Sequence, residues 1–174
     1  MKLSKRTLLI IVLIIVNIAL DQISKVWVRA SVEKGSQSEI IGDFFTLHNV
    51  ENTGAFLGMG SDLNPTLKLI FLLILPVIVL GFVVRYILKD KSLDKLSLIA
   101  FSCIVGGGLA NVYDRFVYGS VTDFFHINFG GVLRTGIFNV ADMSVTAGMI
   151  MLVIASFKKK KRTENIEETN EKLN

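Results

Sequence analysis

The chain has 174 residues, of which 51% are hydrophobic, and it carries a formal net charge of +4. Its length allows one domain. The basic residues flank long apolar runs and do not alternate with aromatic residues, so the positive charge does not indicate nucleic-acid binding. A single cysteine, Cys103, excludes an intramolecular disulfide framework, and its apolar surroundings indicate a small buried residue. The composition therefore favours a membrane protein.

Four runs of the sequence are long and apolar enough to cross, as helices, the roughly 30 Å of hydrocarbon in a bilayer. The first run also has the basic start of a secretory signal peptide, but the polar sequence from Asp21 to Lys25 lacks a small-x-small cleavage site. We therefore predict an α-helical polytopic membrane protein whose residues 1–157 form a single four-helix domain. The predicted spans are residues 8–27, 67–88, 96–115 and 137–157.

The distribution of lysine and arginine predicts how the chain is oriented. Three of these residues precede Leu8, four lie from Arg85 to Lys95, and six follow Phe157, which places thirteen of the nineteen on one side. The positive-inside rule assigns that side, with both termini, to the cytoplasm. The outer segments are then residues 30–66 and 116–136, and the charged residues 158–174 form a cytoplasmic tail that we expect to be disordered.

Both outer segments contain sequences that favour β structure. Residues 39–41 and 44–50 are β-prone and are separated by a Gly-Asp pair, which predicts a small hairpin or meander. In the second outer segment, a turn at residues 118–120 precedes the extended sequence 121–125. The first outer segment is therefore more than a linker.

Ionisable residues at the outward ends of the spans are functional candidates, because charges at membrane depth are costly. Asp21 and Lys25 are four residues apart on one helix face, which favours a structural ion pair over a direct role. The glycine run at 106–108 allows another backbone to approach closely. We interpret the adjacent Asp and Arg that follow this run as a paired anchor. Four candidates of the third span fall within an arc of about 100° on one face: Gly107, Asn111, Asp114 and Arg115.

Asp123 and Asp142 differ from these pairs because neither has a basic partner at local spacing. Asp123 lies among apolar residues before the chain returns toward the membrane, and Asp142 lies one turn into the fourth span, on the same face as Asn139. Two carboxylates in a poorly solvated site cannot both ionise cheaply, so they can share a proton. One then takes a proton from water while the other donates to a scissile carbonyl, as in an aspartyl protease. Interfacial solvation of two unrelated aspartates is the alternative interpretation.

The remaining polar residues indicate no stronger chemistry. His48 and His126 are interpreted as single surface or interface histidines. No His/Cys cluster has metal-ligand spacing, so we expect no metal or cofactor, although two carboxylates leave a metal site open. Asn52 precedes a turn at Gly54 and can donate a hydrogen bond into a site. Two other hypotheses stay open: a non-catalytic assembly factor, and a small transporter or channel whose ion path would use Asp21, Lys25, Asp114 and Arg115.

Five motifs in order resemble those of the bacterial lipoprotein signal peptidase family, also called signal peptidase II. The match runs from Asp21 to Asp142. Each motif alone is weak, but five of them in order on a four-span frame are specific. The motifs are Asp21-Gln22-Ile23-Ser24-Lys25, Asn52-Thr53-Gly54-Ala55-Phe56, Gly107-x-x-x-Asn111-x-x-Asp114-Arg115, Val121-Thr122-Asp123-Phe124 and Phe138-Asn139-Val140-Ala141-Asp142.

The resemblance implies an intramembrane aspartyl endopeptidase of the bacterial plasma membrane. Its activity would be removal of the signal peptide from diacylglyceryl-modified prolipoproteins, on the amino side of the lipidated cysteine. The catalytic pair would be Asp123 and Asp142, with the active site near the outer leaflet. The residues that line or order the site would be Asp21, Lys25, Asn52, Gly54, Gly107, Asn111, Asp114, Arg115 and Asn139.

The resemblance also implies a particular form for the outer segments and a set of partners. The first outer segment would fold as a small β-cradle, and the second would carry a short helix over the site. The expected partners are lipid-modified prolipoproteins, membrane lipids and the cyclic peptide inhibitor globomycin. We expect the protein to be a monomer.

Overall fold

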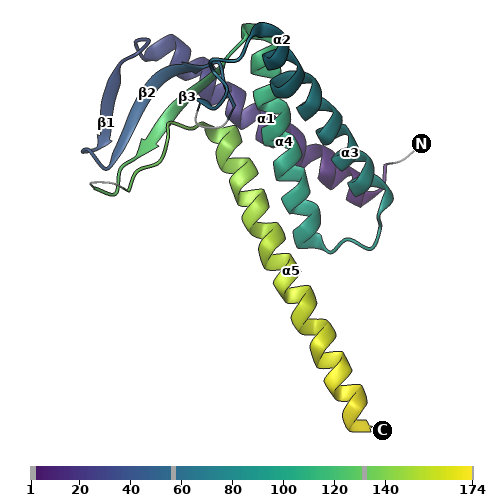
Figure 1. The fold of residues 1–174 in the computed structure, drawn as a ribbon. Coiled ribbons are helices and arrows are strands. Elements are labelled where there is room, and N and C mark those ends of the chain that lie inside the picture. The colour runs from purple at the N-terminus through teal and green to yellow at the C-terminus, as the bar shows by residue number, and fades with distance from the viewer. Residues whose placement is uncertain (1–2, 56–57, 131–132, 174) are drawn as a thin grey trace.

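The computed structural model describes residues 3–55, 58–130 and 133–173. Long helices form a bundle, and a small sheet lies at one end of it, beside the end of α4 and the start of α5 (Figure 1). This is the expected fold class, a four-span helical membrane protein with a small β-sheet. An apolar cluster of Ile10, Ile87 and Leu98 joins three of the helices.

Four helical stretches are long and apolar enough to cross a membrane, as the sequence predicts. The first is α1 (Lys5–Ser31) and the third is α4 (Lys95–Tyr118). The second, Pro65–Lys89, is a continuous run of α2 (Pro65–Lys68), the π-helical η2 (Leu69–Ile74) and α3 (Leu75–Lys89). The fourth, Val140–Lys159, is the first part of α5 (Val140–Leu173).

Side-chain caps start three of these helices. Ser4, Asn64 and Asp94 each accept a hydrogen bond from a backbone N–H in the first turn, at 3.1, 2.9 and 3.0 Å. Such caps satisfy amide groups that have no partner within the helix. Helix α4 ends at Gly119, whose φ of 75° lies in the left-handed region.

Glycines let α4 pack tightly against its neighbours. A Cβ atom on Gly107 would lie 2.4 Å from the carbonyl oxygen of Ala141 in α5. One on Gly106 would lie 2.6 Å from Cβ of Asn17 in α1. The close approach predicted from the glycine run is therefore present, and it places α4 at Gly107 against the start of α5.

The sheet contains β1 (Gln37–Ile41), β2 (Phe45–Asn52) and β3 (Val121–Ile127), in the order β1-β2-β3. Both strand pairs are antiparallel, and β1 and β2 form the predicted hairpin. The second outer segment supplies β3, which pairs Val50 with Asp123 and Asn52 with Val121. This pairing joins the two outer segments into one sheet.

The second outer segment differs from its expected form. Its described residues between α4 and α5 contain no helix, so the short helix expected there is wrong for this part of the chain. Its β-branched and aromatic residues fit a pleated strand, and the free edge of β2 offers backbone partners that a helix could not use.

The tail also differs from expectation, because α5 continues without a break to Leu173 (Figure 1). The sequence from residue 158 is rich in Lys and Glu and contains neither Gly nor Pro. These residues have good helix propensity, and they extend a helix that the membrane span has already started.

Candidate active site

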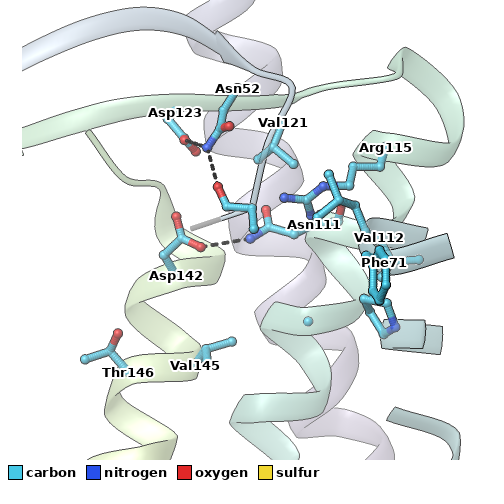
Figure 2. Close-up of a pocket in the computed structure, with 14 residues that line it drawn as sticks. Asn52, Phe71, Asn111, Val112, Arg115, Val121, Asp123, Asp142, Val145 and Thr146 are labelled. Carbon is cyan, nitrogen blue, oxygen red and sulfur yellow. Dashed lines mark hydrogen bonds between the residues drawn. The ribbon is translucent and has the colours of Figure 1, made fainter. Parts of the chain in front are cut away.

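The two aspartates singled out in the sequence line one cavity of about 290 Å³. Asp123 comes from β3 and Asp142 from the first turn of α5, and Figure 2 shows them above and beside Asn111 of α4. Apolar side chains form much of the remaining wall: Phe71, Leu72, Pro76, Val112, Val121 and Val145. The cavity therefore combines two carboxylates with a surface suited to an apolar ligand.

Three asparagines point their amide N–H groups at these carboxylates. Asn52 donates to Oδ2 of Asp123 at 2.9 Å, and Asn139 donates to Oδ1 of the same residue at 2.6 Å. Asn111 donates to Oδ1 of Asp142 at 2.9 Å (Figure 2). Both carboxylates are therefore oriented by neutral donors.

The orientation of each asparagine amide follows from what its oxygen contacts. The Oδ1 atom of Asn52 accepts from the backbone N–H of Gly54, and that of Asn139 accepts from the N–H of Asp142, both at 2.9 Å. The Oδ1 atom of Asn111 accepts from the Lys25 ammonium group at 2.8 Å. A backbone N–H and an ammonium group can only donate, so each NH₂ group must face its aspartate.

Asp142 and Asn139 form a reciprocal cap at the start of α5. The carboxylate of Asp142 accepts from the backbone N–H of Asn139 at 3.2 Å, while the Asn139 side chain caps the N–H of Asp142. This is the geometry of a capping box, with Asn and Asp in place of the more common residues. The cap places Asn139 between the two aspartates, because its NH₂ group contacts Asp123.

Burial changes the acidity of Asp123, which is only 4% exposed. Loss of solvation disfavours the charged carboxylate and raises its pKa to about 6, and nearby Asp142 adds to the rise. Hydrogen bonds from Asn52 and Asn139 and the charge of Lys25 oppose the increase in pKa. Asp123 therefore exchanges its proton close to neutral pH.

A fully buried charge cluster lies behind the site. Lys25 contacts Oδ2 of Asp21 at 2.7 Å and Oδ2 of Asp114 at 2.6 Å. The predicted pair of Asp21 and Lys25 is therefore present, and Asp114 is a second anion for the same ammonium group. Asp21 also accepts from the backbone N–H of Ala141 at 2.8 Å. The cluster thus connects α1 and α4 to the start of α5.

Arg115 does not pair with Asp114, so the interpretation of these neighbours as one paired anchor is wrong. Asp114 contacts Lys25 and also Arg29, whose Nη2 lies 3.3 Å from Oδ1. Arg115 instead donates to the backbone oxygens of Gly54 at 2.8 Å and Asn111 at 3.3 Å. Successive residues of a helix point about 100° apart, so Asp114 faces α1 while Arg115 faces the cavity loop.

Gly54 lies where the loop after β2 turns back on itself. A Cβ atom there would lie 2.6 Å from backbone atoms of Gly58 and Met59, so a side chain has no room. Phe56, which belongs to the same sequence motif, lies outside the described residues. Arg115 and Asn52 both bind Gly54 and both line the cavity, which places this loop beside it.

The two histidines are neighbours outside this cavity. Their rings on β2 and β3 pack edge to face with centroids 5.7 Å apart. Partial burial and the neighbouring His126 lower the pKa of His48. The described residues contain no group of three or more His, Cys, Asp or Glu side chains that could hold a metal ion.

The sequence interpretation missed a second polar cluster, which lies beside Asp123. It contains Arg29 of α1, Glu51 of β2 and Ser120 and Thr122 at β3, linked by hydrogen bonds. The spacing of Arg29, four residues after Lys25 on the same helix face, was the available signal. The partners of Arg29 depend on strand pairing that the sequence did not predict.

Comparisons with known proteins cover the whole of this region. The family model described as signal peptidase (SPase) II matches residues 13–158. A protein named lipoprotein signal peptidase from Clostridium novyi (strain NT) is 38% identical over 144 residues, covering 83% of this chain and 94% of that protein. The protein of the same name from Borreliella burgdorferi (strain ZS7) is 37% identical over 167 residues, covering 93% and 97%. A solved structure of a bacterial membrane enzyme has a TM-score of 0.77 at 30% identity, covering 88% of this chain and 90% of that one.

Proposed function

This chain belongs to the signal peptidase II family, and we propose that it cleaves its substrates with Asp123 and Asp142 as an aspartyl catalytic pair. As a member of that family it is a multi-pass membrane protease that removes signal peptides from prolipoproteins. The finer proposal concerns the mechanism, the cleavage point and the orientation in the membrane. It rests mainly on one observation: the carboxylates of the buried Asp123 and the half-buried Asp142 line the same cavity and are linked through Asn139.

Asp142 is suited to the role of base. Lys25 and Arg115 both bind Asn111, which donates to the Asp142 carboxylate. Through Asn111 both cations are connected to the Asp142 carboxylate. The raised pKa of Asp123, about 6, favours a protonated acid next to it. We therefore assign the role of acid to Asp123, and the role of base to Asp142 on its contact with the cation-bound Asn111.

The reaction follows from these roles. Asp142 takes a proton from water as the water oxygen attacks the scissile carbonyl carbon, and Asp123 donates its proton to the carbonyl oxygen. The resulting tetrahedral diol then breaks its C–N bond as the amide nitrogen takes the proton from Asp142, while Asp123 recovers a proton from a hydroxyl. The products are the signal peptide with a free carboxyl group and the mature protein with a free amino group.

The form of the cavity supports a lipid-modified substrate. Its apolar wall comes from the second, third and fourth membrane-spanning helices, at the end of the bundle that carries the sheet. A signal peptide and a diacylglyceryl group are both apolar and are both held at membrane depth. We propose cleavage on the amino side of the cysteine that carries this lipid, so that the acyl chains stay in the bilayer.

The charge distribution supports an orientation in the bacterial plasma membrane. Most basic residues lie near the termini and the α3–α4 connection, which places these in the cytoplasm and the active site near the outer leaflet. A reporter that is active only in the cytoplasm, fused after residue 174, should be active. If this reporter is inactive, and a reporter that is active only outside the cytoplasm is active at the same position, the proposed orientation is contradicted.

The proposed partners beyond the substrate are membrane lipids and globomycin, with the enzyme acting as a monomer. We expect globomycin to occupy the same apolar-walled cavity as the substrate. Globomycin should therefore inhibit competitively, and the Asp123→Asn variant should still bind it. Inhibition that is independent of substrate concentration would place the inhibitor elsewhere. The mass of the detergent-solubilised enzyme, measured by light scattering, tests the monomer.

The decisive experiment is cleavage of a diacylated lipobox peptide by purified Asp123→Asn and Asp142→Asn variants. Each change keeps the size of the side chain but removes proton transfer, so we expect activity to fall at least about 100-fold. Circular dichroism and thermal unfolding should show that both variants fold. Wild-type activity in either folded variant would contradict the assignment of the pair.

A further inference from the structure

The last turn of α1 carries Arg29, and α1 is in contact with β3 of the sheet. Asp21, Lys25 and Arg29 follow one another at intervals of four residues and so share one face of α1. Lys25 reaches Asp142 through Asn111. Arg29 is connected to the other aspartate, Asp123, through the neighbouring strand residue Thr122.

Arg29 is held at three points. Its Nε atom donates to Oγ1 of Thr122 at 2.7 Å, and Nη2 lies 3.3 Å from Oδ1 of Asp114. Its guanidinium group lies over the ring of Tyr118, with Cζ 4.0 Å from the ring centroid. These contacts leave the side chain only 22% exposed. A planar guanidinium group can bridge several partners in fixed directions, so Arg29 has one preferred position.

Thr122 connects Arg29 to the neighbouring strand, β2. Its hydroxyl accepts from Arg29 and donates to Oε1 of Glu51 at 2.8 Å, and the Ser120 hydroxyl donates to the other oxygen of Glu51. Glu51 and Thr122 are directly paired across β2 and β3. Thr122 is fully buried. The two buried hydroxyl groups therefore both bind Glu51, and the Thr122 hydroxyl also binds Arg29. Such a connected set of hydrogen bonds rigidifies the structure around it.

The residues next to this cluster in sequence are those that act in the cavity. Glu51 precedes Asn52, and Thr122 precedes Asp123. Successive side chains of a strand point to opposite faces, so the cluster occupies one face of the sheet while Asn52 and Asp123 occupy the other. Asn52 and Asp123 form a 2.9 Å hydrogen bond on the cavity face. The preceding residues, Glu51 and Thr122, form a hydrogen bond on the opposite face, and this contact fixes the two strands relative to each other.

We propose that Arg29 is a positioning residue for Asp123, which it places through Thr122 and Glu51 without touching the substrate. This inference rests on the proposed catalytic role of Asp123. Arg29 does not line the cavity that contains the aspartates. Its removal should therefore disturb catalysis more than substrate binding.

The test compares Arg29→Gln, Thr122→Val and the double variant in cleavage of a diacylated lipobox peptide. Arg29→Gln should lower kcat about 10- to 100-fold through misplacement of Asp123, with KM changed less than about twofold. Thr122→Val keeps the branched shape of the strand residue and should lower kcat similarly. If Arg29 acts through Thr122, the double variant should lose no more than the larger single loss. Arg85→Gln, the same change at an exposed arginine far from the site, is the control.

Three outcomes would overturn the proposal. The first is a folded Arg29→Gln enzyme with normal kcat. The second is a set of losses that multiply in the double variant, which would mean that Arg29 acts through Asp114. The third applies if Arg29→Gln does not fold: a folded and fully active Thr122→Val enzyme then excludes the route through Thr122. Full activity of Asp123→Asn would instead remove the proposed catalytic pair itself, so the two failures are distinguishable.

Discussion

Asp142 and Asp123 are held by two different kinds of structure. Asp142 lies in a helix start, where a reciprocal cap with Asn139 and the close contact of Gly107 with Ala141 determine its position. Asp123 lies in a strand, and its position depends on pairing with β2 and on Asn52. Helix packing is part of the membrane core, whereas the sheet is an addition at one end of the bundle (Figure 1). Changes near Asp142 should therefore act through stability, and changes near Asp123 through catalysis.

The largest effect should come from Gly107→Ala, which breaks the support of Asp142. The added Cβ would lie 2.4 Å from a backbone oxygen of α5, so one of the helices must move. We expect a loss of about 1–3 kcal/mol in the free energy of unfolding, together with most of the activity. Thermal unfolding in detergent and the peptide cleavage assay measure both.

Gly81→Ala is the matched control for this change. A Cβ atom at Gly81 meets nothing within 4 Å, and the residue also lies in a membrane-spanning helix. This variant should be as stable as the wild type, since Ala favours the helix over Gly. Equal stability of the two alanine variants would show that close packing at Gly107 does not support Asp142.

A smaller effect, on catalysis and not on stability, is expected for Asn52→Ala. This change removes one donor to Asp123 and leaves the strand intact, so stability should change little. Asn52 orients the Asp123 carboxyl group, and misplacement of this group should lower kcat by about 10- to 100-fold. Asn128→Ala, just beyond the far end of β3, should retain full kcat. If Asn52→Ala loses activity only because it is less stable, this would contradict the expectation that changes near Asp123 act through catalysis.

The smallest effect is a shift in the pH dependence. Asp123 must be protonated to donate, so kcat/KM should fall as pH rises, with a midpoint near the pKa of about 6 for the free enzyme. The donor Asn52 favours the charged carboxylate, and its removal raises the pKa of Asp123. In Asn52→Ala the midpoint should therefore move to higher pH, by about one unit or less. Activity that rises with pH through this midpoint would mean that Asp123 is the base, and a midpoint that moves down would contradict the role of Asn52 as a donor to the charged carboxylate.

Much of the site could be predicted from sequence where local spacing decides the contact. Asp21 and Lys25 form the expected ion pair because i, i+4 residues meet on any helix. Asn139 and Asp142 share a helix face for the same reason, and their reciprocal cap needs only the first turn. The two histidines show the limit, because their ring contact depends on the register of two distant strands.

The contacts that were wrong or missed all depend on which segments meet in space. Asp114 was expected to pair with its neighbour Arg115, yet it contacts two cations of α1. Arg115 faces away from Asp114 and holds the loop at Gly54. Local spacing contains no information on the rotation of α4 against α1, which the packing of small residues on α4 sets.

The sequence by itself determined the four spans, the hairpin, and the presence of both aspartates at one end of the helices, because hydropathy, charge and turn residues act locally. Only the tertiary structure decided that β3 completes the sheet and that three asparagines turn their amide groups to the aspartates. It also decided that Arg29 reaches the back of the strand that carries Asp123. These contacts join residues far apart in the chain, and their geometry follows from helix packing and strand register.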